Sequence, residues 1–266
     1  MLESVALQLP APFHAAPIDA GFILGSGWGD ALPAEKILAQ VPYSELEGYG
    51  ESTVKGHAGE LLLVILRGKR VAVFSGRRHF YEGCSLPQLV FPVELLRCLG
   101  VKMLLITNAA GGLNPAFNPG DLMVLTDHIN LSIVNPLRGP HRPEWGPRFP
   151  DMSHVYDEEL SARLYDLAKE RVHRGIYVFS PGPSFETPAE VRVSRNMGGD
   201  AVGMSTVPEA VLAHAIGMRV VGLSCISNAA AGLSKKPLTH EEVMVESQKA
   251  KPRMSTLLAD FVATLP

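Results

Sequence analysis

The segment from Ser180 to Glu209 contains side chains that can hold a flat polar ring beside an anion. Residues 187–190, TPAE, have the form of a capping box with proline at the first helical position, and therefore predict a helix start. Phe185 and Glu186 come directly before this box and offer an aromatic face and a carboxylate. Backbone N–H groups at a helix start also favour a bound anion.

A second capping box of the same form lies further along this segment. Residues 206–209, TVPE, predict another helix start, and Met204 and Ser205 precede it with a thioether and a hydroxyl. The two helix starts could together line one pocket for a ring and an anion. Two well-capped helices with incidental neighbours would give the same pattern, so this segment alone leaves both interpretations open.

Three small-residue segments follow predicted strands elsewhere in the chain: residues 25–29 (GSGWG), 107–112 (TNAAGG) and 226–232 (ISNAAAG). Small residues at such places let the backbone approach a ligand, and glycine loops bring N–H groups towards anions. The amide of Asn228 can both donate to and accept from the edge of a heterocycle. Tight turns are the alternative for each segment, and residues 25–29 lack the spacing of G-x-G-x-x-G and the lysine of a P-loop.

Residues 76–83, GRRHFYEG, also follow a predicted strand. In an extended stretch Arg77, His79 and Tyr81 face the same side, because side chains alternate with a period of two. Arginine offers a planar fork for phosphate oxygens, histidine adds a donor, and Glu82 could orient either of them. A solvated basic turn is the alternative interpretation.

Short apolar runs alternate with helical patterns along the chain. They predict strands at residues 20–24, 61–66, 70–74, 101–107, 122–126, 176–179, 200–202 and 219–225, and further helices at 85–99, at 157–173 and from 239 towards 261. This alternation predicts one α/β domain over residues 1–266 with a largely buried sheet. Because ligands collect at the carboxyl ends of strands in such sheets, five strand exits with ligand-type residues indicate one site.

Composition excludes several other classes. The 266 residues carry a formal net charge of −3 without a long run of one sign, so we expect neither nucleic acid nor a membrane as a partner. Three cysteines lie far apart, which is typical of reduced thiols in a cytoplasmic protein, and we identify no signal peptide. The nine histidines show no metal-ligand spacing, so we expect no metal.

Taken together, these motifs resemble the purine nucleoside phosphorylases of the low-molecular-weight, trimeric family. The similarity runs from GSGWG at Gly25 to THEEV at Thr239 and includes, in family order, STVKGHAG, GRRHFYEG, TNAAGGLNP, GDLMVLTDHINL, NPLRGP, RFPDMS, GPSFET and AVGMSTVPE. The resemblance implies a central mixed sheet flanked by helices. It also implies a cytoplasmic homotrimer that needs no cofactor, with inorganic phosphate as co-substrate.

The resemblance also assigns roles to residues. Phosphate contacts fall on Ser26, Arg77, His79, Ala109 and Ser205, purine contacts on Phe185, Glu186 and Asn228, and ribose contacts on Tyr81, Met204, His240 and His57. Among these, the catalytic roles fall on Asn228, Glu186 and His79. Phe149 is expected to reach into the neighbouring subunit's site.

The implied reaction is the reversible phosphorolysis of inosine and guanosine, or their deoxy forms, for purine salvage. Phosphate is the nucleophile, Asn228 bonds N7 and O6 of the leaving base, and Glu186 accepts from N1–H. The related methylthioadenosine phosphorylases carry aspartate at the position of Asn228, so the asparagine favours 6-oxopurines. A methylthioadenosine or adenosine phosphorylase and a catalytically silent nucleoside-binding protein are the alternatives.

The chain departs from the family pattern at two places that the structure can address. Trp28 stands where the family more often has leucine, and either crowds the phosphate loop or packs away from it. Residues 1–19 contain three prolines and lack the pattern of an amphipathic helix, so no helix is predicted there.

Overall fold

The computed structural model describes residues 2–50, 58–132, 134–233 and 240–266, with the backbone alone for residues 240–244. Its helices are α1 (Leu2–Gln8), α2 (Leu86–Cys98), α3 (Glu158–Ala168), α4 (Pro188–Asn196), α5 (Val207–Ala215) and α6 (His240–Ala263). Its strands are β1 (Ala20–Leu24), β2 (Lys36–Pro42), β3 (Glu60–Leu66), β4 (Lys69–Ser75), β5 (Met103–Gly112), β6 (Leu122–Asn130), β7 (Val172–Phe179), β8 (Ala201–Gly203) and β9 (Arg219–Ala229).

These strands form one mixed sheet in the order β2-β3-β4-β1-β5-β8-β7-β6-β9. Strand β9 also pairs in parallel with β5, so β5, β8, β7, β6 and β9 close into a ring. Strand β1 lies parallel between β4 and β5. Strands β3 and β4 form an antiparallel hairpin, and β2 pairs with the outer side of β3. The predicted α/β class with a central mixed sheet is confirmed.

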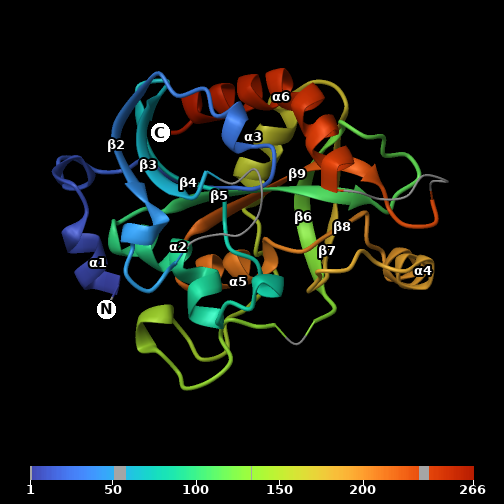
Figure 1. The fold of residues 1–266 in the computed structure, drawn as a ribbon, viewed down its shortest axis with the longest axis horizontal. Coiled ribbons are helices and arrows are strands. Elements are labelled where there is room, and N and C mark those ends of the chain that lie inside the picture. Colours follow the sequence, from blue (N-terminus) through green and yellow to red (C-terminus); the bar gives the residue numbers. More distant parts are fainter. Residues whose placement is uncertain (1, 51–57, 133, 234–239) are drawn as a thin grey trace.

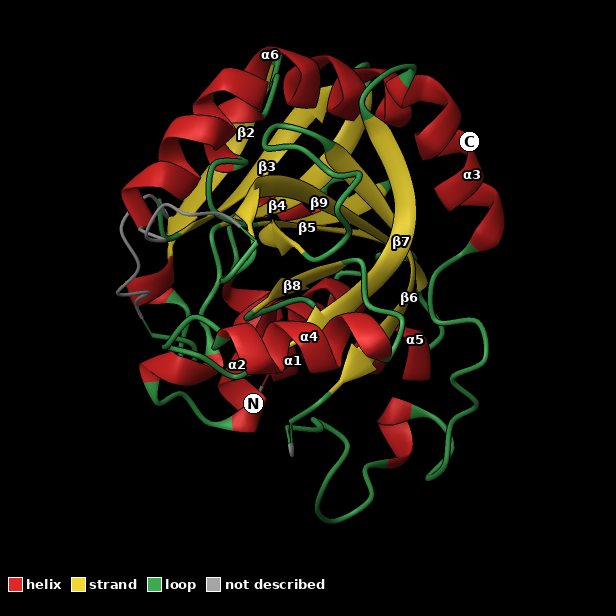
Figure 2. Cartoon of the chain, turned by 90° about the vertical axis from the view of Figure 1, so that its right-hand side faces the viewer, coloured by secondary structure: helices red, strands yellow, loops and turns green. Residues whose placement is uncertain are grey.

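Helices cover both faces of the sheet (Figure 1). Helices α3 and α6 lie on one face, and α1, α2 and α5 lie on the other, as the turned view in Figure 2 also shows. The side chains of β1 alternate between the two layers: Phe22 packs with Phe261 of α6, whereas Ile23 belongs to the cluster of Leu95 in α2. All of β1 is buried, which explains its continuous apolar run.

Capping boxes form at the starts of α2 and α4, and the one at α4 was predicted from the sequence. At α2 the backbone N–H of Ser85 donates to Gln88 Oε1 at 3.0 Å, and Gln88 N donates to Ser85 Oγ at 3.4 Å. At α4 the backbone N–H of Thr187 donates to Glu190 Oε2 at 2.7 Å, and Glu190 N donates back to Thr187 Oγ1 at 3.3 Å. Each pair satisfies backbone N–H groups that a helix start leaves without partners.

Several sequence-based boundaries are wrong. Strand β5 continues to Gly112 and β9 to Ala229, because the two segments predicted as strand exits pair with each other. Helix α3 ends at Ala168, since the following residues enter β7. Strand β2 was not predicted, and the N-terminal residues do form a short helix, α1, which buries Val5 despite the nearby prolines.

Residues 131–132 and 134–156 are largely irregular, apart from a short 3-10 helix at Pro143–Trp145. Trp145 anchors this loop because its indole Nε1 donates to Glu94 Oε1 of α2 at 2.9 Å. Arg142 adds an ion pair with the same carboxylate at 2.7 Å. In the part of the chain that the structure describes, no helix has both the length and the apolar character needed to cross a membrane.

Candidate active site

The segments predicted to bind phosphate meet where the carboxyl ends of β1 and β4 lie beside residues 107–109 of β5. The backbone N–H of Gly76 donates to Leu24 O at 3.2 Å, which holds the exits of β4 and β1 side by side. Gly25 N donates to Thr107 Oγ1 at 3.1 Å. A Cβ atom on Gly25 would lie 2.7 Å from Thr107 O and 2.9 Å from Asn108 Cα, so this close approach requires glycine. Ser26 follows Gly25, and Ala109 follows Asn108. This close approach therefore brings Ser26 and Ala109 to one region.

Trp28 packs away from the phosphate loop and into the core. Its side chain is fully buried in the cluster between the sheet and α6, which includes Phe22. The indole Nε1 donates to Asn108 O at 2.9 Å. Trp28 therefore ties the Gly25 turn to β5, a bond that the more usual leucine cannot make.

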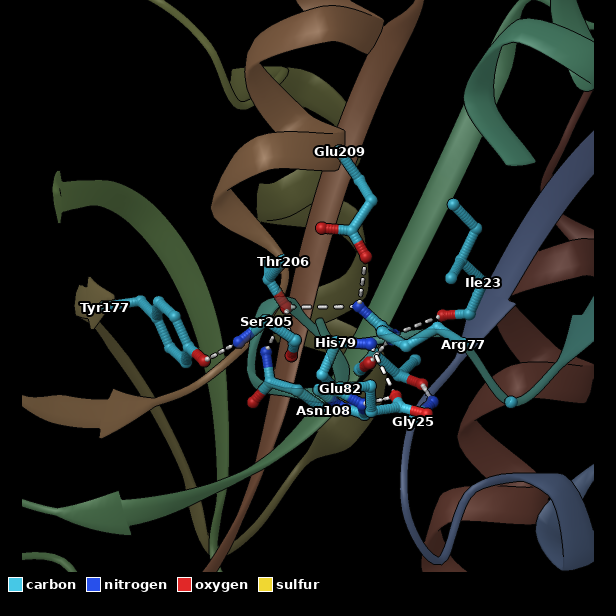
Figure 3. A network of polar contacts seen from close by, with 12 residues as sticks. Ile23, Gly25, Arg77, His79, Glu82, Asn108, Tyr177, Ser205, Thr206 and Glu209 are labelled. Atoms are coloured by element: carbon cyan, nitrogen blue, oxygen red, sulfur yellow. Dashed lines mark hydrogen bonds and ion pairs between the residues drawn. The ribbon is translucent and has the colours of Figure 1, made fainter. Parts of the chain in front are cut away.

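Arg77 points into the protein and pairs with Glu209 (Figure 3). Its Nη1 atom lies 3.1 Å from Glu209 Oε1 and 3.4 Å from Thr206 Oγ1. Its Nη2 atom donates to the carbonyl oxygens of Ile23, at 2.9 Å, and Thr107. The guanidinium fork predicted for phosphate oxygens thus faces four protein acceptors, and Arg77 places a buried positive charge beneath the site.

His79 is oriented by Glu82, as the sequence suggested. Glu82 Oε1 accepts from the backbone N–H of His79 at 2.6 Å and lies 3.2 Å from His79 Nδ1. This carboxylate favours the neutral tautomer that carries its hydrogen on Nδ1. The rings of His79 and Tyr81 stack at a centroid distance of 4.8 Å. Burial raises the pKa of Tyr81 to about 12.

The predicted capping box at residues 206–209 is wrong. Thr206 has φ 75° and ψ −52°, its side chain caps no N–H group, and Val207 N donates back to Ser205 O at 2.8 Å. These features define a γ-turn with a left-handed central residue, which is rare and strained for a β-branched side chain. Val207 N–H is thereby used and Pro208 has none, so this helix start offers an anion fewer donors than predicted. Glu209 binds Arg77 instead of capping the helix.

The predicted ribose residues Tyr81 and Met204 both lie close to Gly182. A Cβ atom on Gly182 would lie 2.5 Å from Met204 Sδ and 3.0 Å from Tyr81 Cδ1. The exits of β4, β7 and β8 therefore converge here. Ser205, the residue after Met204, is 8% exposed, and its backbone N–H donates to the Tyr177 hydroxyl at 3.4 Å.

The predicted purine residues Phe185 and Glu186 precede α4. Phe185 leaves 41% of its surface exposed. Glu186 is half-buried, and its Oε1 atom is buried without a hydrogen-bond partner among the residues that the structure describes. Burial raises the pKa of this carboxyl group, against hydrogen bonds from its own backbone and from Ser180 that lower it. An acceptor in this state fits a ligand N–H group.

Asn228, in β9, is held by its neighbours. Its Oδ1 atom accepts from Ser227 Oγ at 2.7 Å, and its Nδ2 atom donates to Ala229 O at 3.0 Å. One Nδ2 hydrogen and one Oδ1 lone pair remain for a ligand. A Cβ atom on Gly232 would lie 2.8 Å from Pro188 Cβ, so the end of β9 reaches the start of α4.

All the ligand contacts assigned to these residues stay predictions. His57 and the side chain of His240 lie outside the described residues. Phe149 is 88% exposed, at the surface of the irregular loop.

Asn108, Thr206 and Glu209 were not predicted as parts of the site. The structure buries Asn108 in β5, where its Nδ2 atom donates to Thr206 Oγ1 at 2.9 Å. Thr206 and Glu209 match the pattern of a helix cap, with a threonine and a glutamate three residues apart before an apolar run. This local pattern gave no indication that they bond residues far away in the sequence.

The comparisons with known proteins agree with this geometry. The sequence profile of the phosphorylase superfamily matches residues 19–263. Purine nucleoside phosphorylase 1 of Bacillus subtilis is 49% identical, covering 91% of each chain, and the Bos taurus purine nucleoside phosphorylase is 42% identical, covering 92% of this chain and 88% of its own. Schistosoma mansoni purine nucleoside phosphorylase in complex with inosine superposes with a TM-score of 0.91 at 34% identity, covering 100% of this chain and 96% of that one.

The chain therefore belongs to the phosphorylase superfamily and, within it, to the purine nucleoside phosphorylases. The resemblance seen in the sequence motifs is confirmed, and the protein is an enzyme of the pentosyltransferase type.

Proposed function

We propose that this protein catalyses the reversible phosphorolysis of 6-oxopurine nucleosides, such as inosine, guanosine and their deoxy forms, to the free base and (deoxy)ribose 1-phosphate. The observation that supports this specificity most directly is the buried Oε1 atom of Glu186, which lacks a partner among the described residues. N1–H of a 6-oxopurine supplies the missing donor. Adenine presents an acceptor at N1 and would leave the carboxylate unsatisfied.

Asn228 complements this arrangement at the other edge of the base. Because Ser227 Oγ holds Oδ1 at 2.7 Å, the amide is fixed in one orientation. Its remaining Nδ2 hydrogen suits the O6 carbonyl, and its remaining Oδ1 lone pair suits a protonated N7. The amide therefore stabilises the leaving base as negative charge develops on it.

Phosphate is the proposed nucleophile and binds at the opposite end of the pocket. An oxygen of hydrogen phosphate bonds to C1′ as the bond from C1′ to N9 breaks. The phosphate gives up its proton as it becomes the sugar phosphate, and the departing base takes up a proton at N7. Ser26, His79, Ala109 and Ser205 are the proposed contacts, with the positive charge of Arg77 below them. Positioning and electrostatic stabilisation suffice for this displacement, so we propose that no metal, cofactor or protein nucleophile takes part.

We further propose that the whole chain acts as one domain in a cytoplasmic homotrimer. The 88% exposure of Phe149 fits a side chain that is covered by a second copy and completes that copy's site. We propose neither nucleic acid nor a membrane as a partner.

The test is purine release from inosine with and without inorganic phosphate, repeated with adenosine and methylthioadenosine. We expect release to require phosphate and inosine to be preferred. Release without phosphate would mean a hydrolase, and preference for methylthioadenosine would overturn the proposed specificity. Tight nucleoside binding without turnover would identify a binding protein.

A further inference from the structure

The strained γ-turn at Thr206 lies inside a buried hydrogen-bond network that ends on Ser205. Thr206 is fully buried, and its Oγ1 atom accepts from Asn108 Nδ2 at 2.9 Å and from Arg77 Nη1 at 3.4 Å. The same oxygen lies 3.3 Å from Ser205 Oγ, where either hydroxyl can be the donor (Figure 3).

The donors around Thr206 Oγ1 indicate the direction of its bond with Ser205 Oγ. A hydroxyl oxygen has two lone pairs and one hydrogen. Asn108 Nδ2 and Arg77 Nη1 are both donors and occupy the two lone pairs of Thr206 Oγ1. The hydroxyl hydrogen of Thr206 is therefore left to donate to Ser205 Oγ. The hydrogen of Ser205 Oγ is in turn directed to an acceptor outside this network.

A phosphate oxygen is such an acceptor, because at neutral pH inorganic phosphate presents mainly unprotonated oxygens. We propose that Thr206 is a positioning residue for the phosphate co-substrate: it fixes Ser205 Oγ as a hydrogen-bond donor towards phosphate. This inference rests on the proposed function of the site. It gives the γ-turn a role, since strained backbone persists where the surroundings hold it and often accompanies a binding site.

The network also explains how the turn is held in place. Asn108 bonds the turn with its side chain and accepts from the Trp28 indole with its backbone oxygen at 2.9 Å, so the Ser205 and Ser26 segments share one anchor. Glu209 holds Arg77 from the first turn of α5 at 3.1 Å. The donors to Thr206 are thus fixed from two sides.

The test compares Thr206→Val, which keeps the branched shape but removes the hydroxyl, with Thr206→Ser, which keeps the hydroxyl. We expect Thr206→Val to raise the KM for phosphate about tenfold, the size of one hydrogen bond, with the KM for inosine changed less than about twofold. Thr206→Ser should bring the phosphate KM back towards the wild-type value. Asn108→Ala should also raise the KM for phosphate. The double variant should raise this KM by less than the product of the two single effects, because both substitutions remove the same hydrogen bond between Asn108 and Thr206.

Thr126→Val is the matched control for the loss of a threonine hydroxyl. Thr126 Oγ1 donates to Gly175 O at 3.2 Å, outside the network. Asn114→Ala is the control for Asn108→Ala, because Asn114 Nδ2 also makes a 2.9 Å bond, to Asp200 Oδ1. Neither control should change the phosphate KM.

Binding of inorganic phosphate is also measured by calorimetry without nucleoside, which needs no turnover. Weaker phosphate binding by Thr206→Val and normal binding by Thr206→Ser would support the inference. It is overturned if Thr206→Val binds phosphate like the wild type, or if the phosphate and inosine KM values rise equally. If the wild type releases base without phosphate and binds none, the proposed function itself fails, which is a different result from a phosphate-dependent wild type with unaffected variants.

Discussion

Arg77 Nη1 lies 3.1 Å from Glu209 Oε1, and each of these two side chains is only 1% exposed. The pair joins the exit of β4 to the first turn of α5, where a negative charge is also favoured by the helix dipole. The second carboxylate oxygen, Glu209 Oε2, is buried and has no hydrogen-bond partner within the described part of the chain. Loss of either member would leave the other as a buried charge without its counterion.

We therefore expect Glu209→Ala to lower the free energy of unfolding by about 3–5 kcal/mol, the usual effect of breaking a buried ion pair. Urea unfolding measures this change. The control is Lys249→Ala, which removes an exposed pair with Glu246 and should change stability by less than about 1 kcal/mol. Equal effects of the two substitutions would show that the buried pair contributes little.

Glu186 predicts an acid limb in the pH profile. Burial raises its pKa, so the carboxylate that accepts N1–H is lost at a higher pH than for an ordinary glutamate. We expect kcat/KM for inosine to fall as the pH decreases through this raised pKa, and the limb to be absent in Glu186→Gln. A limb that persists unchanged in the variant would assign it to another group.

The raised pKa of Glu186 affects stability in the opposite direction to activity: it favours the folded state at low pH. A carboxyl group with a raised pKa in the folded state favours folding below its unfolded pKa, and this contribution is lost as the pH rises through the folded pKa. As the pH rises through the folded pKa, the Tm of the wild type should therefore decrease relative to the Tm of Glu186→Gln. A difference in Tm that does not vary with pH would contradict the shift.

Asn228→Asp should move the preference from inosine towards adenosine. A carboxylate in place of the amide repels the O6 carbonyl but accepts from a 6-amino group. We expect the ratio of kcat/KM for inosine to that for adenosine to fall by about tenfold or more, the effect of one mispaired polar group. A uniform loss with both nucleosides would mean that Asn228 does not distinguish the two edges.

Trp28→Phe should weaken both the fold and the phosphate site. It keeps most of the buried ring but leaves Asn108 O without the indole donor, which is expected to lower stability by about 1–3 kcal/mol. Trp28→Leu adds a cavity and should destabilise further. Trp145→Phe is the matched control, because it loses a 2.9 Å indole bond to Glu94 and should leave the phosphate KM unchanged.

The two capping boxes show where sequence patterns succeed and fail. Thr187 and Glu190 form the predicted box because both lie at the surface, with no stronger partner nearby. Thr206 and Glu209 have the same spacing but are buried. Thr206 accepts a hydrogen bond from Asn108, and Glu209 pairs with Arg77. A local motif predicts a local structure only where no long-range partner competes for its polar groups.

Strand lengths were underestimated for a related reason. Asn108 and Asn228 belong to polar, small-residue ends of apolar runs, which sequence patterns assign to turns. In the fold β5 and β9 supply each other's hydrogen bonds along their whole length, so these ends remain extended. Most of the predicted ligand-type residues nevertheless reach one region, because that expectation depended on strand direction and not on strand length.

Closure of the ring has a consequence for solubility. Since β9 returns to pair with β5, β2 is the one strand of the described sheet that pairs with a single neighbour. An open strand side invites pairing with another chain, and β2 carries features that oppose this: an exposed Lys36, an irregular register between Ile37 and Ala39, and Pro42 at its end. The sheet thus resists growth by strand addition at its single vulnerable border.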